Sequence, residues 1–192
     1  MILSLIGFMG CGKSSVGRRL SELLCCPFMD LDAVIEEQTG RSIPEIFASD
    51  GEAAFRQMEL DALNSILTDS SSSEFGELSA PLAPSVPQTS NIRIVLSLGG
   101  GAIMTPRCAN LVKENTLCIY LRTSVDTLVE RLTDEAAGRP LLSSDSDLRS
   151  RIETLMAQRA TTYESTAHHI IDTDGFTIDE LACRITSICN LL

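Results

Sequence analysis

Short apolar runs alternate along the chain with longer segments in which apolar residues recur every three to four positions. Such runs are typical of buried strands, and the longer periodic segments are typical of helices. The predicted strands are residues 2–6, 27–31, 92–98, 117–121 and 169–172, and the predicted helices are residues 13–25, 32–39, 51–68, 106–114, 124–136, 146–165 and 178–190. This alternation predicts an α/β fold with a parallel sheet and helices on both faces.

Two local signals mark boundaries within this pattern. Thr177 and Glu180 have the spacing of a capping box, which favours a helix start just after Thr177. Residues 69–91 are rich in Ser and Pro and have no usable periodicity, so we expect a flexible insertion there. The length of 192 residues fits a single domain over 1–192 that contains this insertion.

Charge and cysteine usage narrow the expected partners and compartment. The formal net charge is −11 at pH 7, and so acidic a surface repels nucleic acid. No apolar run approaches the roughly 18 residues that span a membrane, so we expect no membrane partner. The seven cysteines are odd in number and include no CxxC pair, which favours reduced thiols in the cytoplasm. We expect a monomer.

The stretch GFMGCGKS, residues 7–14, matches the pattern GxxxxGK[ST] between a predicted strand and a predicted helix. In such a loop successive backbone N–H groups bind phosphate oxygens, and the following helix adds the positive end of its dipole. Lys13 would reach the β and γ phosphates of a nucleoside triphosphate, and the Ser14 hydroxyl would ligate Mg²⁺. The alternative is a glycine-rich turn with an exposed lysine.

Asp30 and Asp32 follow the second predicted strand and alternate, so on an extended segment they share one face. If the strand ends there, both lie at the carboxyl edge of the sheet, where ligands bind in open α/β folds. One carboxylate would then support a metal–water shell, and the other would accept a proton from an acceptor hydroxyl. Equally, Asp32 would merely cap the helix that follows.

A second set of residues suggests a substrate site. Arg56 and Glu59 lie three residues apart on a predicted helix, either as a surface ion pair or with Glu59 orienting Arg56 toward an anion. Three glycines, residues 99–101, follow a strand directly, which favours close backbone approach of a ligand. Arg139 either faces solvent or sits on a mobile lid. Arg159 lies late in a predicted helical segment and alone is weak evidence for a site.

In this order, GxxGxGKS, DxD, GExxFR, GGG, RPLL and R-x-x-x-Y resemble the shikimate kinase family over nearly the whole chain except residues 69–91. The resemblance implies a P-loop fold like that of nucleoside monophosphate kinases, with a five-stranded parallel sheet, a lid and a substrate-binding region. It implies transfer of a phosphoryl group from ATP to shikimate with Mg²⁺, giving shikimate 3-phosphate for aromatic amino-acid biosynthesis.

The resemblance also implies roles for individual residues. The ATP phosphates would be held by Gly10, Cys11, Gly12, Lys13, Ser14 and Ser15, with Arg139 as the lid arginine. Mg²⁺ would lie near Ser14 and Asp30. Shikimate would be bound by Asp32, Arg56, Gly99, Gly100, Gly101 and Arg159, with Asp32 as the candidate base and Lys13, Asp32 and Arg139 as the catalytic set.

The sequence departs from the family pattern at two places, and two alternative functions remain open. The 69–91 connection is longer than is usual in the family, and "DTDGFT", residues 172–177, lacks a proline associated with the adenine pocket in some members. A gluconate kinase of the same fold also acts on a hydroxylated acid. A nucleotide-binding regulatory module without turnover would need neither the DxD pair nor a lid arginine.

Overall fold

In the computed structural model, which describes residues 1–69, 91–133 and 148–189, one five-stranded sheet forms the centre of the molecule. Its strands are β1 (Ile2–Ile6), β2 (Phe28–Asp30), β3 (Ile94–Ser97), β4 (Thr116–Arg122) and β5 (His169–Asp172). They lie in the order β2-β3-β1-β4-β5, and every neighbouring pair is parallel. The predicted parallel α/β sheet is therefore confirmed.

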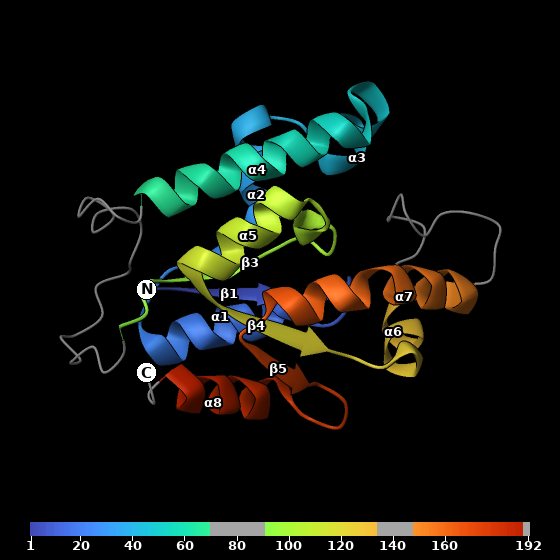
Figure 1. Ribbon diagram of the computed structural model, residues 1–192. Helices are drawn as coiled ribbons and strands as arrows, with labels where there is room; N and C mark the ends of the chain where they lie inside the picture. The colour runs from blue at the N-terminus through green and yellow to red at the C-terminus, as the bar shows by residue number, and fades with distance from the viewer. Residues whose placement is uncertain (70–90, 134–147, 190–192) are drawn as a thin grey trace.

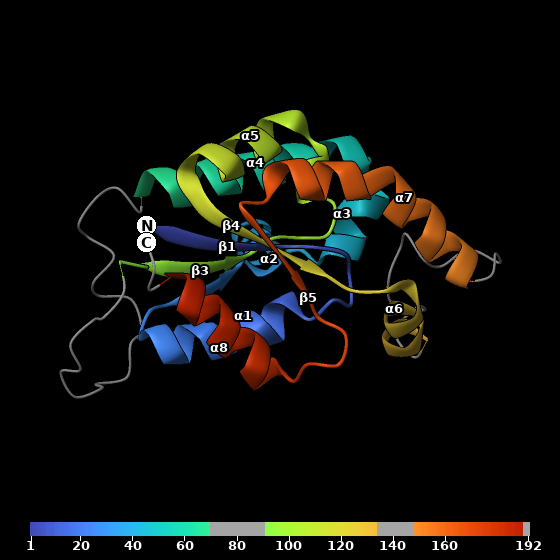
Figure 2. The same cartoon turned by 60° about the horizontal axis from the view of Figure 1, so that its bottom comes forward.

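Helices cover both faces of this sheet. They are α1 (Lys13–Leu24), α2 (Leu31–Thr39), α3 (Ile43–Ser49), α4 (Gly51–Asp69), α5 (Pro106–Asn115), α6 (Val125–Leu132), α7 (Leu148–Thr166) and α8 (Ile178–Cys189), with a short 3₁₀ helix η1 (Ala102–Met104). Figures 1 and 2 show α1 and α8 on one face and α4, α5 and α7 on the other. The loops that follow β1, β2 and β3 therefore emerge between two helical layers.

The alternation of side chains in β1 explains why two cores form. Successive strand residues point to opposite faces. Leu3 and Leu5 belong to the core beneath α1 and α8, whereas Ile2 and Ile6 belong to the core beneath α4, α5 and α7. The whole strand is buried, as expected for a central strand of a parallel sheet.

Several predicted boundaries need correction. The helix predicted over 124–136 ends at Leu132, where Thr133 is the C-cap. Helix α3 was not predicted, although Ser42 and Glu45 form a capping box in which the Ser42 backbone N–H donates to Glu45 Oε2 at 2.8 Å. The proposed cap role of Asp32 is wrong, because Asp30 caps α2 and accepts from the Asp32 N–H at 3.2 Å. The capping box of Thr177 and Glu180 is present as predicted.

Two predicted features fall largely outside the described part of the chain. Asp69 ends α4 and Asn91 precedes β3, but the rest of the 69–91 insertion and Arg139 lie outside it. Within the described ranges, no helix is both long and apolar enough to cross a membrane.

Candidate active site

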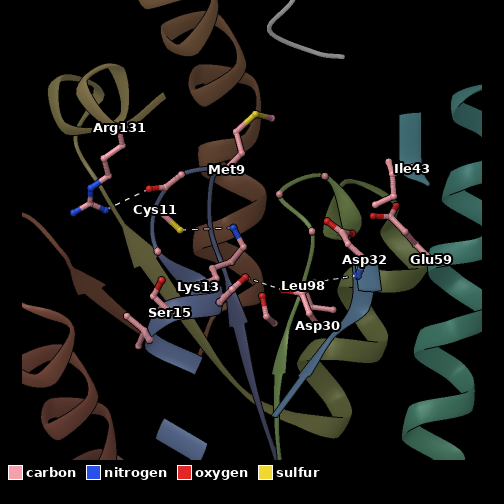
Figure 3. A pocket seen from close by; sticks show the side chains of 18 of the residues that line it. Met9, Cys11, Lys13, Ser15, Asp30, Asp32, Ile43, Glu59, Leu98 and Arg131 are labelled. Carbon is pink, nitrogen blue, oxygen red and sulfur yellow. Dashed lines mark hydrogen bonds between the residues drawn. The ribbon is translucent and has the colours of Figure 1, made fainter. Parts of the chain in front are cut away.

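A cavity of about 790 Å³ lies at the carboxyl edge of the sheet, where the loops after β1, β2 and β3 emerge. Two kinds of chemistry line it. Figure 3 shows Lys13 on one side of the loop after β3, Asp32 and Glu59 on the other, and Asp30 near Leu98 between them. The cavity therefore joins the phosphate loop to the second acidic and basic set predicted from the sequence.

The phosphate loop, residues 7–12, has a backbone that requires glycine at three points. Gly7, Gly10 and Gly12 have φ of 145°, 80° and 95°, a region that side-chain-bearing residues rarely adopt. A Cβ at Gly10 would also lie 2.9 Å from the Leu132 side chain at the end of α6. Gly12 then begins α1 as its N-cap, so the free N–H groups of the first helical turn face the cavity side of the loop.

Lys13 lies across the mouth of this loop rather than in solvent. Its side chain is buried, and Nζ donates to the carbonyl oxygens of Gly7 and Phe8, at 3.0 Å each. Cys11 is buried beside it, with Sγ 3.8 Å from Nζ. The alternative of a turn with an exposed lysine is excluded, and the ammonium is held where anionic phosphate oxygens would approach.

Ser14 and Asp30 form a pair of oxygen donors next to the loop. The Ser14 hydroxyl donates to Asp30 Oδ2 at 2.8 Å, and the other Asp30 oxygen caps α2. Mg²⁺ prefers oxygen ligands, keeps several waters and is usually bound by one or two protein oxygens beside substrate phosphates. The chemistry of this pair therefore fits a Mg²⁺ ion whose other ligands would be phosphate oxygens of a nucleotide and water. No cluster of three or more His, Cys, Asp or Glu with metal-site geometry occurs in the part that the structure describes.

Asp32, Arg56 and Glu59 form the opposite end of the cavity. Arg56 donates to Glu59 Oε2 at 2.6 Å and to Glu52 Oε1 at 2.9 Å. Glu59 is only 1% exposed, so the interpretation of a surface ion pair is wrong. Two carboxylates hold the guanidinium, and Arg56 lines the cavity, so its remaining N–H donors are available to an anionic ligand.

Burial changes the acidity of both carboxyl groups in this cluster. It raises the pKa of Asp32 to about 6, and the charge of Asp30 acts in the same direction. Burial also raises the pKa of Glu59 to about 7 against the opposing effect of Arg56. Asp32 Oδ1 is buried and has no hydrogen-bond partner. A buried carboxylate oxygen without a partner is costly, which disfavours the ionised form of Asp32 and agrees with its raised pKa.

The three consecutive glycines leave room for these side chains. A Cβ at Gly99 would lie 2.6 Å from Asp32 Oδ1, and one at Gly101 would lie 2.5 Å from an Arg56 guanidinium nitrogen. Both distances are impossible for a real Cβ. Close approach of a ligand to these glycines stays a prediction, and the structure adds close approach of Asp32 and Arg56.

Arg159 lies beside the cavity, against the loop that follows β3. It is buried on α7, and its guanidinium lies over the Phe8 ring, 5.8 Å from the centroid. One of its nitrogens donates to the Gly100 carbonyl at 3.2 Å. Arg159 does not line the cavity, whereas Gly99, Gly100 and Gly101 do.

Sequence reasoning missed three parts of the cavity wall. Ile43, Pro44 and Phe47 of α3 form an apolar wall, which the capping box at Ser42 would have revealed. Arg131 on α6 lines the cavity and donates to the Gly10 carbonyl at 3.3 Å, and Figure 3 shows it beside the phosphate loop. No local signal distinguished it from other helix arginines. The third part is an apolar end made by Phe176, Ile178 and Leu181.

A phosphate loop after the first strand of a β2-β3-β1-β4-β5 sheet, facing an acid–arginine cluster across one cavity, defines a P-loop kinase with a nucleoside-monophosphate-kinase-like fold. The family model described as shikimate kinase matches residues 9–73 and 70–190. The chain belongs to the shikimate kinase family, and it is a phosphotransferase.

Individual relatives agree with this assignment. A shikimate kinase from Salinibacter ruber is 36% identical over 98% of this chain and 84% of that protein, and one from Thermus thermophilus is 36% identical over 95% and 86%. The structure of a shikimate kinase from Acinetobacter baumannii in complex with shikimate has a TM-score of 0.81 and 31% identity, over 97% of this chain and 91% of that one. A shikimate kinase structure from Aquifex aeolicus has a TM-score of 0.72 and 27% identity, over 98% and 95%.

Proposed function

We propose that this chain transfers the γ-phosphoryl group of ATP to a hydroxyl of shikimate, giving shikimate 3-phosphate and ADP. The observation that carries the proposal is the single cavity that connects the phosphate loop with Asp32, Arg56 and Glu59. Phosphoryl transfer requires that donor and acceptor be held in line and that charge be neutralised. It requires little covalent chemistry by the protein. Family membership and the bound shikimate of the Acinetobacter relative support the choice of acceptor.

The phosphate loop forms the donor side of the proposed mechanism. Backbone N–H groups of residues 10–15 hold the ATP phosphates, with Ser15 lining the cavity beside Ser14. Lys13 exchanges its carbonyl partners for phosphate oxygens. Ser14 and Asp30 would hold Mg²⁺, which when bound would neutralise negative charge on the phosphates. Arg139, which belongs to the RPLL motif outside the described residues, is proposed as the lid arginine.

The acceptor side consists of the cluster at the other end of the cavity. Asp32, which lines the cavity, accepts a hydrogen bond from the acceptor hydroxyl and takes its proton during transfer. Arg56, oriented by Glu59, binds the carboxylate of shikimate. Gly99, Gly100 and Gly101 leave space for both side chains, and Arg159 turns from Gly100 to the same carboxylate.

The substrate choice is tested by ADP release in a coupled assay with shikimate, gluconate and nucleoside monophosphates offered separately. Turnover with shikimate alone is the expected result. Turnover with gluconate instead would assign the chain to another small-molecule kinase, and no turnover with any of them would favour a regulatory module.

The donor site is tested by Lys13→Ala, which removes one charge contact with the phosphates. Loss of one such transition-state contact costs about 2.7–4 kcal/mol, so turnover should fall by about 10²–10³. Lys113, the only other lysine of the chain, lies on α5 and donates to the Ser165 carbonyl, so Lys113→Ala is the matched control. A folded Lys13→Ala protein with turnover close to that of Lys113→Ala would contradict the phosphate-loop assignment.

We further propose that the chain acts in the cytoplasm as a monomer. All seven cysteines lie in the described ranges, and none is in a disulfide, which supports a reducing compartment. Light scattering at several protein concentrations tests the monomer, because a concentration-dependent mass would contradict it.

A further inference from the structure

One carbonyl next to the cavity accepts hydrogen bonds from two side chains of the same helix. Arg159 and Tyr163 lie four residues apart on α7 and therefore on one helix face. Arg159 donates to the Gly100 oxygen at 3.2 Å, and the Tyr163 hydroxyl donates to the same oxygen. A carbonyl has two lone pairs, so it satisfies both donors at once.

Gly100 occupies a crowded position between two functional loops. A Cβ placed there would lie 3.0 Å from the Met9 backbone nitrogen and 3.5 Å from the Gly7 oxygen, both in the phosphate-loop segment. Gly100 also lines the cavity. A shift of its peptide group would thus disturb the loop after β3 and the phosphate loop together.

Tyr163 is held more rigidly than Arg159. It is fully buried, and its ring stacks on that of Tyr120 in β4, with centroids 5.0 Å apart and planes 24° apart. Burial raises the pKa of Tyr163 far above its usual value, so the phenol stays a donor in any ordinary assay buffer. Arg159 has a long side chain and several donors, and it can turn without moving the helix.

We propose that Tyr163 is a positioning residue for the acceptor site. Its hydroxyl keeps the hydrogen bond to the Gly100 carbonyl, and so holds Gly100 in place, when Arg159 turns from that carbonyl to the carboxylate of the bound acceptor. This inference rests on the proposed function. Without Tyr163, the departure of Arg159 would leave the Gly100 carbonyl without a side-chain donor, and the cost of that lost bond would oppose acceptor binding. With Tyr163 in place, Arg159 leaves at little cost.

The kinetic test compares Tyr163→Phe with Tyr120→Phe, which makes the same chemical change on the stacked neighbouring ring. In Tyr163→Phe the shikimate KM should rise about five- to thirty-fold, or about 1–2 kcal/mol at 1.4 kcal/mol per factor of ten, with the ATP KM and kcat within about threefold. Tyr120→Phe should leave the shikimate KM within about twofold, because no bond to Gly100 is lost. An unchanged shikimate KM in a folded Tyr163→Phe protein would overturn the inference.

A double variant separates positioning from a purely structural role. In an Arg159→Ala background no arginine leaves Gly100 upon binding, so adding Tyr163→Phe should raise the shikimate KM by less than about twofold. A purely structural role predicts instead that the increases of the shikimate KM in the two single variants multiply. It also predicts that the ATP KM rises equally or that Tm falls strongly. Either of these results would overturn the proposal.

Tyrosine emission gives a second readout that does not depend on the Tyr163→Phe protein. The chain has two tyrosines and no tryptophan, so in Tyr120→Phe all such emission comes from Tyr163. Adding shikimate should change this emission, because Arg159 leaves the shared carbonyl, and the shikimate concentration at half of the change should be close to the shikimate KM. Adding gluconate should leave the emission unchanged. Constant emission at saturating shikimate would overturn the inference alone, whereas wild-type protein without shikimate turnover would overturn the proposed function and the inference with it.

Discussion

At the scale of single residues, Asp30 and Asp32 show how position decides the role of a side chain. Both are aspartates, and only Leu31 separates them. Asp30 uses one oxygen to cap α2 and the other to accept from Ser14. Asp32 lies two positions further on, where Gly99 and the surrounding core bury it and leave Oδ1 without a partner. The two environments separate a metal-side carboxylate from a proton acceptor.

The raised pKa values of Asp32 and Glu59 predict a rise of kcat/KM for shikimate between about pH 6 and 7. Asp32 accepts a proton only when ionised, above about pH 6, and Glu59 pairs fully with Arg56 only when ionised, above about pH 7. Activity should therefore be lost as the pH falls through this window and level off above it. The check is a pH–rate profile of the wild type.

Two variants locate the groups responsible for that rise. Glu59→Gln should remove the upper part of the rise, and Asp32→Asn should lower kcat at every pH because no base is left. Glu52→Gln, a change to the exposed partner of Arg56, should keep the wild-type profile. A flat wild-type profile from pH 5.5 to 7.5 would contradict this assignment.

Arg56 and Asp32 should differ in which kinetic constant they control. A carboxylate remote from the reacting hydroxyl is held alike in the ground and transition states, so Arg56→Ala should mainly raise the shikimate KM. Asp32→Asn should mainly lower kcat. Steady-state kinetics with both substrates varied will measure these constants. A raised ATP KM in Arg56→Ala with an unchanged shikimate KM would show that Arg56 binds ATP and not shikimate.

At the scale of elements, segments distant in sequence complete the cavity. The turn between β5 and α8 brings Phe176 to the end of the cavity nearest the phosphate loop, and α3 supplies the wall near Arg56. Phe176 also lies under the Arg184 guanidinium, 3.7 Å from its ring centroid. An apolar, aromatic end beyond the phosphates suits a nucleobase, whose flat face stacks well on an aromatic ring.

Phe176, in the turn between β5 and α8, should therefore control affinity for ATP. Base–aromatic stacking is worth about 1–3 kcal/mol per base, so Phe176→Ala should raise the ATP KM by about five-fold or more. The shikimate KM should stay within about twofold, because the acceptor cluster is at the other end of the cavity. Phe176→Trp, which keeps a stacking face, is the control, and an ATP KM unchanged in Phe176→Ala would refute the assignment.

At the scale of the whole molecule, the two edges of the sheet have different tasks. The phosphate loop, Asp30 and the three glycines all follow strands at the carboxyl edge. The described residues that flank 70–90 lie at the amino edge: the N-terminal amine donates to the Asn91 carbonyl at 2.8 Å, and α4 ends on the same side in Figure 1. Because strands in a parallel sheet all point one way, chemistry gathers at one edge and return connections at the other.

Replacement of residues 71–89 by a short Gly/Ser link should then leave kcat and both KM values within about threefold, since doubling a loop costs only about 0.6 kcal/mol. Thermal melts of the two proteins provide the control for folding. A shortened protein that melts cooperatively yet loses shikimate turnover tenfold would show that this segment reaches the site.

The sequence by itself determined the order of strands and helices, the phosphate loop and the family. These features depend on periodicity and on spacings within one or two turns, and local backbone preferences express them directly. β1, β5 and the beginning of α1 lie where the pattern predicted, because apolar runs and glycine positions leave few alternatives. The short α3 was missed although its capping box was present, since seven residues give too little periodicity to detect.

Only the tertiary structure decided which side chains meet. Burial of Glu59, the space that Gly99 and Gly101 leave for Asp32 and Arg56, and the shared contact of Arg159 and Tyr163 with Gly100 all join residues from different elements. No periodicity records such contacts, because they depend on how helices pack across the sheet. The pKa values of Asp32 and Glu59 follow from that packing, and so the chemistry of the site is a property of the fold rather than of its motifs.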